Sequence, residues 1–418
     1  MGLVDIARNK SASGMTIDEF FNQFFRGSTT ANAGVSVNET TAMRFSVVWG
    51  CIMVISQTLA WPPLKIWQAR PTGGRDEAKL HPLNDILHYA PNDDMPAITL
   101  KETVHSHTLL SGNGYALPTR NKGGEIVDLY PAPWTHMEPR RNPITRALEY
   151  RYIDRGKEEV LPPEKVFHIP GLGFDGIKGY SPIRMCMEAI GLGLAAEQFA
   201  ALFYANGANI GGFLAVEGGT GNKERRDEIR KELENKFKGL SHSHEVMILP
   251  KGTEFHRLEM PLAEAQFIET RKFQVEEIAR IYRVPLHLLQ NLDRATFSNI
   301  EHQDLGFVKH TMMPWYVRWE QYINQRLLTR AERQKGLYAE FNLNALLRGD
   351  SKTQAEIAHF ERQDGFISTN EYRERRGQNP RPEPEADELF INGNMVRLVD
   401  AGKVQPQRPP SEPPKGGA

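Results

Sequence analysis

Cysteine is scarce in this chain of 418 residues, which contains only Cys51 and Cys186. The two lie far apart in the sequence and form neither a CxxC pair nor the spacing of a metal site. A disulfide framework is therefore not expected. We interpret both as small, reduced side chains of a protein from a reducing compartment.

An excess of charge of either sign is also lacking, because 51 lysines and arginines face 52 aspartates and glutamates, a net charge of -1. No global positive field is available to hold nucleic acid, so any contact with DNA must be local or weak. The most apolar run, 45–61, is short for a bilayer and contains polar residues, which predicts a buried helix and no membrane partner. The N-terminus shows no export signal.

Motifs for catalysis are missing as well: the sequence has no GxSxG, HExxH or SxxK element. The stretch "GLGFDG", 171–176, matches GxGxxG, but no βαβ pattern follows it, so we predict a turn. His105 and His107 fall on a predicted helix, where this spacing separates the rings by about 200°. His242 and His244 lie in a serine-rich segment. We predict no enzyme, no cofactor and no metal; a nucleotide-binding enzyme stays open as an alternative.

What is present is an α+β pattern. After a polar arm, 1–40, which includes the aromatic-rich stretch 15–27, the region 41–180 mixes helices and short strands. We predict helices over 41–59 and 97–112, and a hairpin that turns at Gly123 and Gly124. The other predicted strands lie around 64–68, 134–140, 148–154 and 165–169.

The middle of the chain predicts two long helices around a small insert. Ser181 and Pro182 make a good N-cap and first helical residue, so a helix should run over 181–206. A strand, helix, strand, strand pattern occupies 210–260, and a second helix should run over 262–282.

The polar stretch "NLDRATFSNIEHQ", 291–303, interrupts this helical region. Ser298 and Glu301 fit a capping box, which predicts a loop over 290–298 and a new helix from there to about residue 328. Pro314 lies inside that helix, where it removes a backbone donor and should cause a kink.

The remainder predicts a strand near 337 that returns to the first α+β region, and then two short helices within 351–380 that are separated at Gly365. The tail, 381–418, is rich in proline and glutamate, and we expect it to be disordered.

Three stretches in this order resemble one family: "ETRKFQVEEIARIYRVPLHLL", "ATFSNIEHQDLGFVKHTMMPW" and "GFISTNEYRERRGQNP". They resemble the portal proteins of tailed bacteriophages with the HK97-type capsid, over about 41–380. The resemblance implies an α+β portal fold with a wing, a two-helix stem, a clip, a tunnel loop, a long kinked helix and a helical crown. These parts correspond to 41–180 and 299–350 (wing), 181–209 and 261–289 (stem), 210–260 (clip), 290–298 (tunnel loop) and 351–380 (crown).

The resemblance further implies a ring of subunits, commonly twelve, at one capsid vertex of a virion assembled in the host cytoplasm. Double-stranded DNA would be packaged through this ring and later ejected. The implied partners are the large terminase subunit, a head–tail adaptor and the major capsid protein. A head–tail connector or capsid protein without a DNA channel is the alternative.

In such a ring the tunnel loop points toward the axis. The residues expected to line the channel are Asn291, Asp293, Arg294, Ala295, Thr296, Phe297 and Ser298. Between 261 and 310 there are six lysines and arginines and seven aspartates and glutamates. A nearly neutral channel wall lets DNA slide, because each DNA phosphate that the protein neutralises strengthens the binding of DNA. Arg294 departs from the small or polar residue expected there, so it is a candidate DNA contact.

Overall fold

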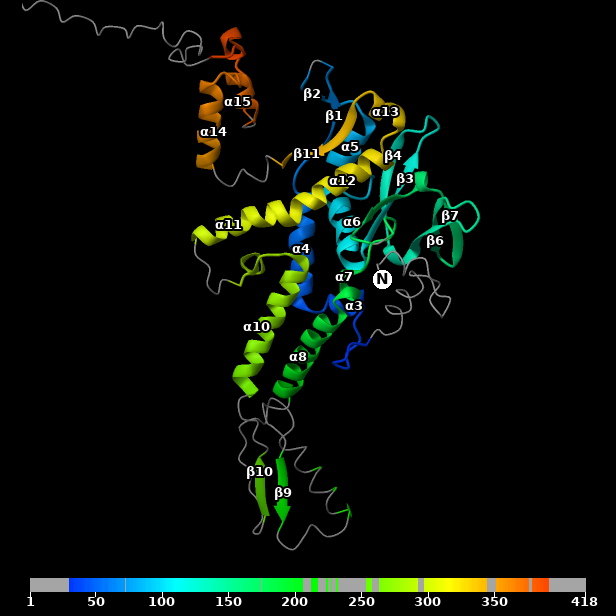
Figure 1. Ribbon diagram of the computed structural model, residues 1–418, viewed down its shortest axis with the longest axis vertical. Coiled ribbons are helices and arrows are strands. Elements are labelled where there is room, and N and C mark those ends of the chain that lie inside the picture. Colours follow the sequence, from blue (N-terminus) through cyan, green and yellow to red (C-terminus); the bar gives the residue numbers. More distant parts are fainter. Residues whose placement is uncertain are drawn as a thin grey trace, which may run out of the picture. The chain divides into compact units, whose positions relative to one another are not determined.

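The computed structural model divides the chain into two compact units, Met1–Asn342 and Leu343–Ala418. It is a mixed α+β structure (Figure 1). The residues that the structure describes are 30–71, 73–173, 175–205, 212–216, 223–224, 227, 231, 253–257, 263–291, 297–343, 351–375 and 378–390.

Three helices form the centre of the first unit: α4 (Ser46–Ala60), α6 (Ala97–Ser111) and α12 (Met313–Arg326). Their facing side chains are apolar and fully buried, as in Val48, Val104 and Tyr316. The predicted helix over 41–59 is two helices, because α3 (Glu39–Ala42) ends before α4 begins. The prediction for α6 is confirmed, and Gly112 ends it with a left-handed backbone, φ 82°.

Sheet β4-β3-β8 packs on α6 and contains the predicted hairpin. Its strands are β3 (Asn113–Arg120), β4 (Ile126–Ala132) and β8 (Phe167–Pro170). The hairpin turns at Gly124, where a φ of 86° suits glycine. A second sheet, β5-β6-β7, follows, with strands β5 (Met137–Arg141), β6 (Leu148–Asp154) and β7 (Lys157–Leu161). Strand β7, with four exposed residues of five, was not predicted.

A third sheet joins the two ends of the first unit. Strand β1 (Leu64–Ala69) pairs with β11 (Leu337–Phe341), so that Leu64 lies opposite Phe341. This pairing confirms the predicted return strand. Strand β2 (Arg75–Glu77) completes the sheet, α5 (Pro82–His88) packs on β1, and α13 (Arg330–Gln334) packs on β11.

The two long helices of the middle region lie side by side (Figure 1). Helix α10 (Ala263–Tyr282) agrees with its prediction. The predicted continuous helix over 181–206 is wrong, because the chain forms a four-residue helix, α7 (Pro182–Met185), and then α8 (Met187–Ala205). Ser181 caps α7 as expected, but its hydroxyl also donates to the Leu110 carbonyl at 2.7 Å. This contact with α6 fixes α7 separately from α8.

Between α8 and α10 the described residues include one antiparallel pair, β9 (Gly212–Val216) and β10 (Thr253–Arg257). Most of the rest of the predicted insert, including His242 and His244, lies outside the described residues.

The end of the predicted flexible arm is packed rather than free. Ala31 and Val37 are buried, and the Asn32 N–H donates to the Glu188 carboxylate at 3.0 Å. Gly191 of α8 leaves the space for this contact, because a Cβ there would lie 2.2 Å from the Ala31 Cβ. Residues 30–40 of the predicted arm thus belong to the packed structure, and 1–29 lie outside the described residues.

The second unit contains the two predicted short helices, α14 (Ser351–Gln363) and α15 (Thr369–Arg375). Gly365 lies between them with a φ of 73°. The predicted tail is corrected at its start: the Arg381 N–H donates to the Asn370 side chain at 2.7 Å, and Ala386 is buried. Residues 391–418 lie outside the described part.

Candidate functional site

The candidate site is the connection between α10 and α11 (Phe297–Phe307). After α10 the backbone turns at Arg283, forms a short 3₁₀ helix, η4 (Leu286–Leu289), and turns again at Gln290. The Asn291 N–H donates back to the Leu286 carbonyl at 3.1 Å. Of the residues expected to line a channel, Asp293, Arg294, Ala295 and Thr296 lie outside the described residues. Their position stays a prediction.

His287 joins the two sides of this connection. Its Nε2 lies 2.8 Å from the Asp304 carboxylate and its Nδ1 lies 2.9 Å from Gln303 Oε1, both on α11. Since a carboxylate only accepts, Nε2 is the donor toward Asp304. The His287 side chain is only 8% exposed, whereas that of Asp304 is 53% exposed. His287 was not predicted from the sequence, because its partners lie 16 and 17 positions away and leave no local pattern.

A second contact comes from Thr311, in the π-helical segment Val308–Met312 that follows α11. The Thr311 hydroxyl donates to the Arg283 carbonyl at 2.7 Å, and Thr311 is buried. We call this bond and the two His287 bonds the loop-base contacts. They fix the end of α10, η4 and α11 relative to one another, so the chain enters and leaves the segment 291–298 at set positions.

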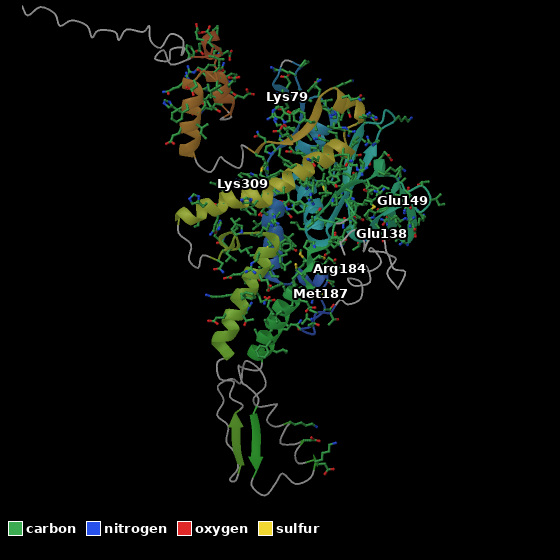
Figure 2. All side chains as sticks on the ribbon, viewed as in Figure 1. Lys79, Glu138, Glu149, Arg184, Met187 and Lys309 are labelled. Atoms are coloured by element: carbon green, nitrogen blue, oxygen red, sulfur yellow. The ribbon has the colours of Figure 1, made fainter. Side chains whose placement is uncertain are left out.

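The kink predicted at Pro314 stays a prediction, but a π-helical segment directly precedes the helix that contains this proline. Regular α-helix ends at Phe307, residues Val308–Met312 are π-helical, and α12 begins at Met313 with Pro314 in its first turn. A proline has no N–H to give, and a wider turn before it accommodates its ring. Lys309, in the π-helical segment, is labelled in Figure 2.

The predicted capping box needs a correction. Helix α11 begins at Phe297, so Ser298 and Glu301 both lie inside it rather than Ser298 lying before it. Ser298 therefore occupies the first turn, and the residue before the helix, Thr296, is outside the described part. The physical reason is that a cap pattern marks a helix start only to within one or two residues.

The glycine-rich stretch 171–176 belongs to a tightly packed turn. The Asn113 side chain accepts from the Gly179 N–H at 2.8 Å and donates to the Gly179 carbonyl at 2.8 Å. A Cβ on Gly179 would lie 2.0 Å from the Gly112 carbonyl oxygen, and one on Gly173 would lie 2.0 Å from the Lys178 oxygen. These glycines let backbones approach one another, which agrees with the predicted turn.

His105 and His107 occupy separate aromatic surroundings on α6. His105 Nδ1 accepts from Trp319 Nε1 at 3.3 Å, and its ring meets Trp315 edge-on. His107 meets Trp134 edge-on. Burial lowers the pKa of His105 to about 3 and that of His107 to about 4. Within the described residues, no group of three or more side chains could hold a metal ion.

Apolar side chains on the two long helices and on α11 remain exposed. Leu192 and Leu202 of α8 are 47% and 65% exposed. Phe273 of α10 and Leu305 of α11 are 52% and 59% exposed. Of the helices that the structure describes, none is long and apolar enough to cross a membrane. Exposed apolar residues in this density are typical of a protein interface.

Comparison with known proteins decides the family. The sequence model of the family described as "Phage portal protein" matches residues 46–377, which include both long helices and the candidate site. The chain belongs to the phage portal protein family. A portal protein has a structural role, and this agrees with the absence of catalytic motifs from the sequence.

Two relatives have similar length. The portal protein of Enterobacteria phage HK97 is 32% identical over 373 residues, which cover 88% of this chain and 86% of the relative. The probable portal protein of Streptomyces phage phiC31 is also 32% identical, over 87% of this chain and 81% of the relative.

Solved structures show the same fold. The crystal structure of an HK97-family portal protein from Corynebacterium diphtheriae is similar with a TM-score of 0.57 and 17% identity, over 74% of this chain and 96% of that one. A chain of a native gene transfer agent virion matches with a TM-score of 0.57 and 22% identity, over 82% and 94%. A related neck structure was computed with C12 symmetry.

Proposed function

We propose that the chain forms a ring, with twelve subunits as the expected number, at one vertex of a capsid. Double-stranded DNA passes through the axis of this ring, first inward under the large terminase subunit and later outward during ejection. The outside of the ring contacts the major capsid protein, and the head–tail adaptor attaches to it after packaging. The observation that carries this proposal is the family match over 46–377.

The exposed apolar residues support assembly. Leu192 and Leu202 cannot be covered by the described part of their own chain, so contact with a neighbouring subunit is what would remove them from water. A subunit that uses two different faces makes heterologous contacts, and these close into a ring when the rotation allows it. The C12 neck structure of the gene transfer agent is an example in a protein of this fold.

The loop-base contacts support a channel role for 291–298. A segment that touches moving DNA must be held at its ends while its tip stays free to adapt, and His287 and Thr311 hold those ends. Arg294 is the one lysine or arginine in the proposed lining, and Asp293 directly precedes it in the sequence. Repeated by symmetry, Arg294 would make a circle of cations whose weak individual contacts with phosphate add up.

The insert 210–260 is proposed as the clip, which receives the terminase and then the adaptor. Its described strands, β9 and β10, form a two-stranded pair. A pair of this size is only marginally stable alone, so it should pack against neighbouring clips.

Native mass spectrometry of the purified chain tests the ring, and a closed oligomer of one size is expected. If only monomers and dimers are observed at every salt and protein concentration, the proposal is overturned. The connector alternative predicts a ring without an axial opening, and the enzyme alternative predicts that the purified chain binds ATP or NAD in calorimetry.

The channel role has its own test. Arg294→Glu should leave the ring intact and change DNA packaging or retention in the particle, because it reverses the charge that faces phosphate. Lys79→Glu, in the segment between β2 and α5, is the matched charge reversal and should leave both unchanged; Lys79 is labelled in Figure 2. Wild-type packaging and retention with Arg294→Glu would contradict the role.

A further inference from the structure

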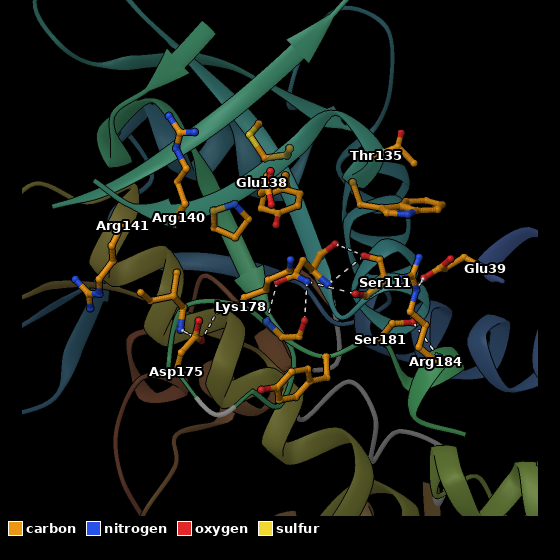
Figure 3. Close-up of a pocket in the computed structure, with 18 of the residues that line it drawn as sticks. Glu39, Ser111, Thr135, Glu138, Arg140, Arg141, Asp175, Lys178, Ser181 and Arg184 are labelled. Atoms are coloured by element: carbon orange, nitrogen blue, oxygen red, sulfur yellow. Dashed lines mark hydrogen bonds and ion pairs between the residues drawn. The ribbon is translucent and has the colours of Figure 1, made fainter. Parts of the chain in front are cut away.

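A cleft of about 880 Å³ lies between strand β5 and the segment 175–185 that leads into α7 (Figure 3). Arg140, Arg141 and Asp175 lie at one end of it, and Glu39 and Arg184 lie at the other. All of its lining residues belong to the first unit. The portal function proposed above does not use this cleft.

The end of the cleft near Asp175 has an excess of positive charge. Arg141 and Lys178 lie there, Arg146 also lines the cleft, and no carboxylate of the described residues pairs with any of the three. Glu138, which also lines the cleft, is paired with Arg151 at 3.5 Å. The Asp175 carboxylate is engaged by its own loop, since it accepts from the Ile177 and Lys178 backbone N–H groups at 2.8 Å. An acidic ligand is therefore favoured at this end.

The opposite end is balanced in charge. Arg184 is paired there with Glu39 at 3.1 Å. The apolar side chains along the cleft are those of Trp134, Met137, Ile177 and Met185, of which Met185 is 47% exposed. A ligand for the whole cleft would combine carboxylates with large apolar side chains.

Strand β5 contributes an edge to the cleft. In its sheet it pairs with β6 on one side and has no partner among the described strands on the other. Pro139, which lines the cleft, has no N–H and so lacks the donor that another long strand would need. Side-chain docking is thus favoured over addition of a full strand.

The chain itself enters the described structure beside this cleft. The Asn32 N–H is bound to Glu188, and Glu188 is four residues from Arg184, which lines the cleft. Four residues span at most about 15 Å. Residues 1–29 therefore begin within easy reach, since each residue adds up to about 3.5 Å.

The sequence of that N-terminal segment has the composition that the cleft favours. Asp18 and Glu19 are followed by four phenylalanines within six residues, in "DEFFNQFF". We propose that residues 15–25 of the chain dock into the cleft of their own subunit. The two carboxylates face Arg141 and Lys178, and the phenylalanines contact the apolar side chains near Met185. The N-terminal segment would then brace β5 against α7.

Hydrogen exchange of the full-length protein, followed by mass spectrometry, tests the docking. Changing Phe20, Phe21 and Phe24 to serine together should speed amide exchange in 137–141 and 177–180 by roughly tenfold or more, because the cleft loses its occupant. The matched control changes the polar pair between the phenylalanines, Asn22→Ser with Gln23→Ser, and should leave exchange unchanged. Exchange in the β3–β4 turn, 121–125, should not respond to either variant.

Charge reversal gives an independent test. Asp18→Lys with Glu19→Lys should speed exchange in the same two stretches, and adding Arg141→Glu with Lys178→Glu should slow it again. Unchanged exchange in the phenylalanine variant, or no recovery in the charge-swapped one, would overturn the proposal. Ring size by native mass spectrometry stays wild-type in every variant if the portal proposal holds, so the two ideas fail separately.

A zero-length carbodiimide cross-link decides which segment occupies the cleft. A bond between Glu19 and Lys178 is expected, and it should form within one chain when ¹⁵N-labelled and unlabelled protein are mixed. Cross-links between labelled and unlabelled chains would show that a neighbouring copy fills the cleft, which overturns docking within the subunit. Absence of the Glu19–Lys178 bond while other carboxylate–lysine bonds form would also count against it.

Discussion

The body of the first unit and the helix α8 bury apolar side chains in different ways. Around α4, α6 and α12 the chain covers its own large residues, and Trp319 and Tyr316 are 1% and 0% exposed. On α8 the same chain covers Ile190 completely but leaves Leu202 65% exposed. The body therefore covers its largest side chains within one subunit, although Trp49 of α4 is 51% exposed, whereas on α8 the more exposed Leu202 is left for another surface.

Polar contacts show the same difference. In the body, bonds join residues that are far apart in sequence, such as the Tyr316 hydroxyl to the Thr58 carbonyl at 2.6 Å. Between α8 and α10 the ion pair of Arg271 and Glu197 spans 3.4 Å, with Arg271 48% exposed. An exposed pair of this kind contributes little stability. Changes in the body should thus affect folding, and changes on α8 should affect assembly.

Lowering the pH should produce the largest difference in stability between the two regions. Burial, with a smaller effect of nearby Arg318 and Arg326, lowers the pKa of His105 and His168 to about 3. In the unfolded chain the value is about 6.5, so the unfolded state binds the protons first as pH falls. The body should lose about 1.4 kcal/mol per pH unit for each histidine between about pH 6.5 and 3.

Urea midpoints measured between pH 7 and pH 5 test this, because most carboxylates stay charged there. His168→Gln should make the dependence on pH shallower. His136→Gln, at a side chain that is 40% exposed, is the control and should leave the slope unchanged. Equal slopes in wild type and His168→Gln would contradict the account.

Truncation in the core should have the next largest effect. Trp319→Ala removes a buried ring and its bond to His105, and should lower the free energy of unfolding by about 3 to 5 kcal/mol. Trp61→Ala, at a side chain that is 58% exposed, should change it by about 0.5 kcal/mol or less. Similar losses at the two positions, in denaturant titrations of each variant, would remove the contrast in burial.

A change on α8 should leave folding intact and abolish the ring. Leu192→Asp with Leu202→Asp places charges where a neighbour is proposed, and burial of each leucine is worth about 1.5 to 3 kcal/mol. Light scattering after size exclusion should show monomers with unchanged circular dichroism. Leu80→Asp, at a leucine that is 100% exposed, is the control and should still assemble. A normal ring from the α8 variant would show that this face is not an interface.

The smallest expected effect concerns the loop-base contacts. His287→Ala should cost about 1 to 3 kcal/mol locally, because it leaves Asp304 and Gln303 without their shared partner. Amide exchange in 286–291 and 300–305 should speed up while exchange in α6 stays slow. His310→Ala is the matched control, on the same helical stretch and outside these contacts. Equal exchange in wild type and His287→Ala would show that the histidine does not hold the loop.

Elements with a strong local pattern were predictable from the sequence. The helices α6 and α10 and the β3–β4 hairpin agree with their predictions to within one to three residues, because periodicity and glycine turns are local signals. The break at Cys186 was not predictable. Next to this break, Ser181 bonds to Leu110, which is 71 residues away. The local sequence "SPIRMCMEAIGLG" gives no sign of a contact at that distance.

The candidate site was predictable only in outline. The sequence predicted a polar loop over 290–298, of which 292–296 lie outside the described residues, and a kink at Pro314, before which the structure has a π-helix. The start of α11 was misplaced by two residues, and the role of His287 was missed. A contact between residues 16 or 17 positions apart depends on how η4 and α11 pack, which no local pattern records.

In the proposed ring, α8 forms a subunit contact and residues 291–298 lie at the axis. A cryo-electron-microscopy map of the purified full-length protein tests this arrangement most directly. The map should show a closed ring with an axial opening, with Leu192 and Leu202 of α8 against the next subunit and residues 291–298 at the narrowest point. A ring with 291–298 on its outer surface, or with α8 facing solvent, would contradict the claim.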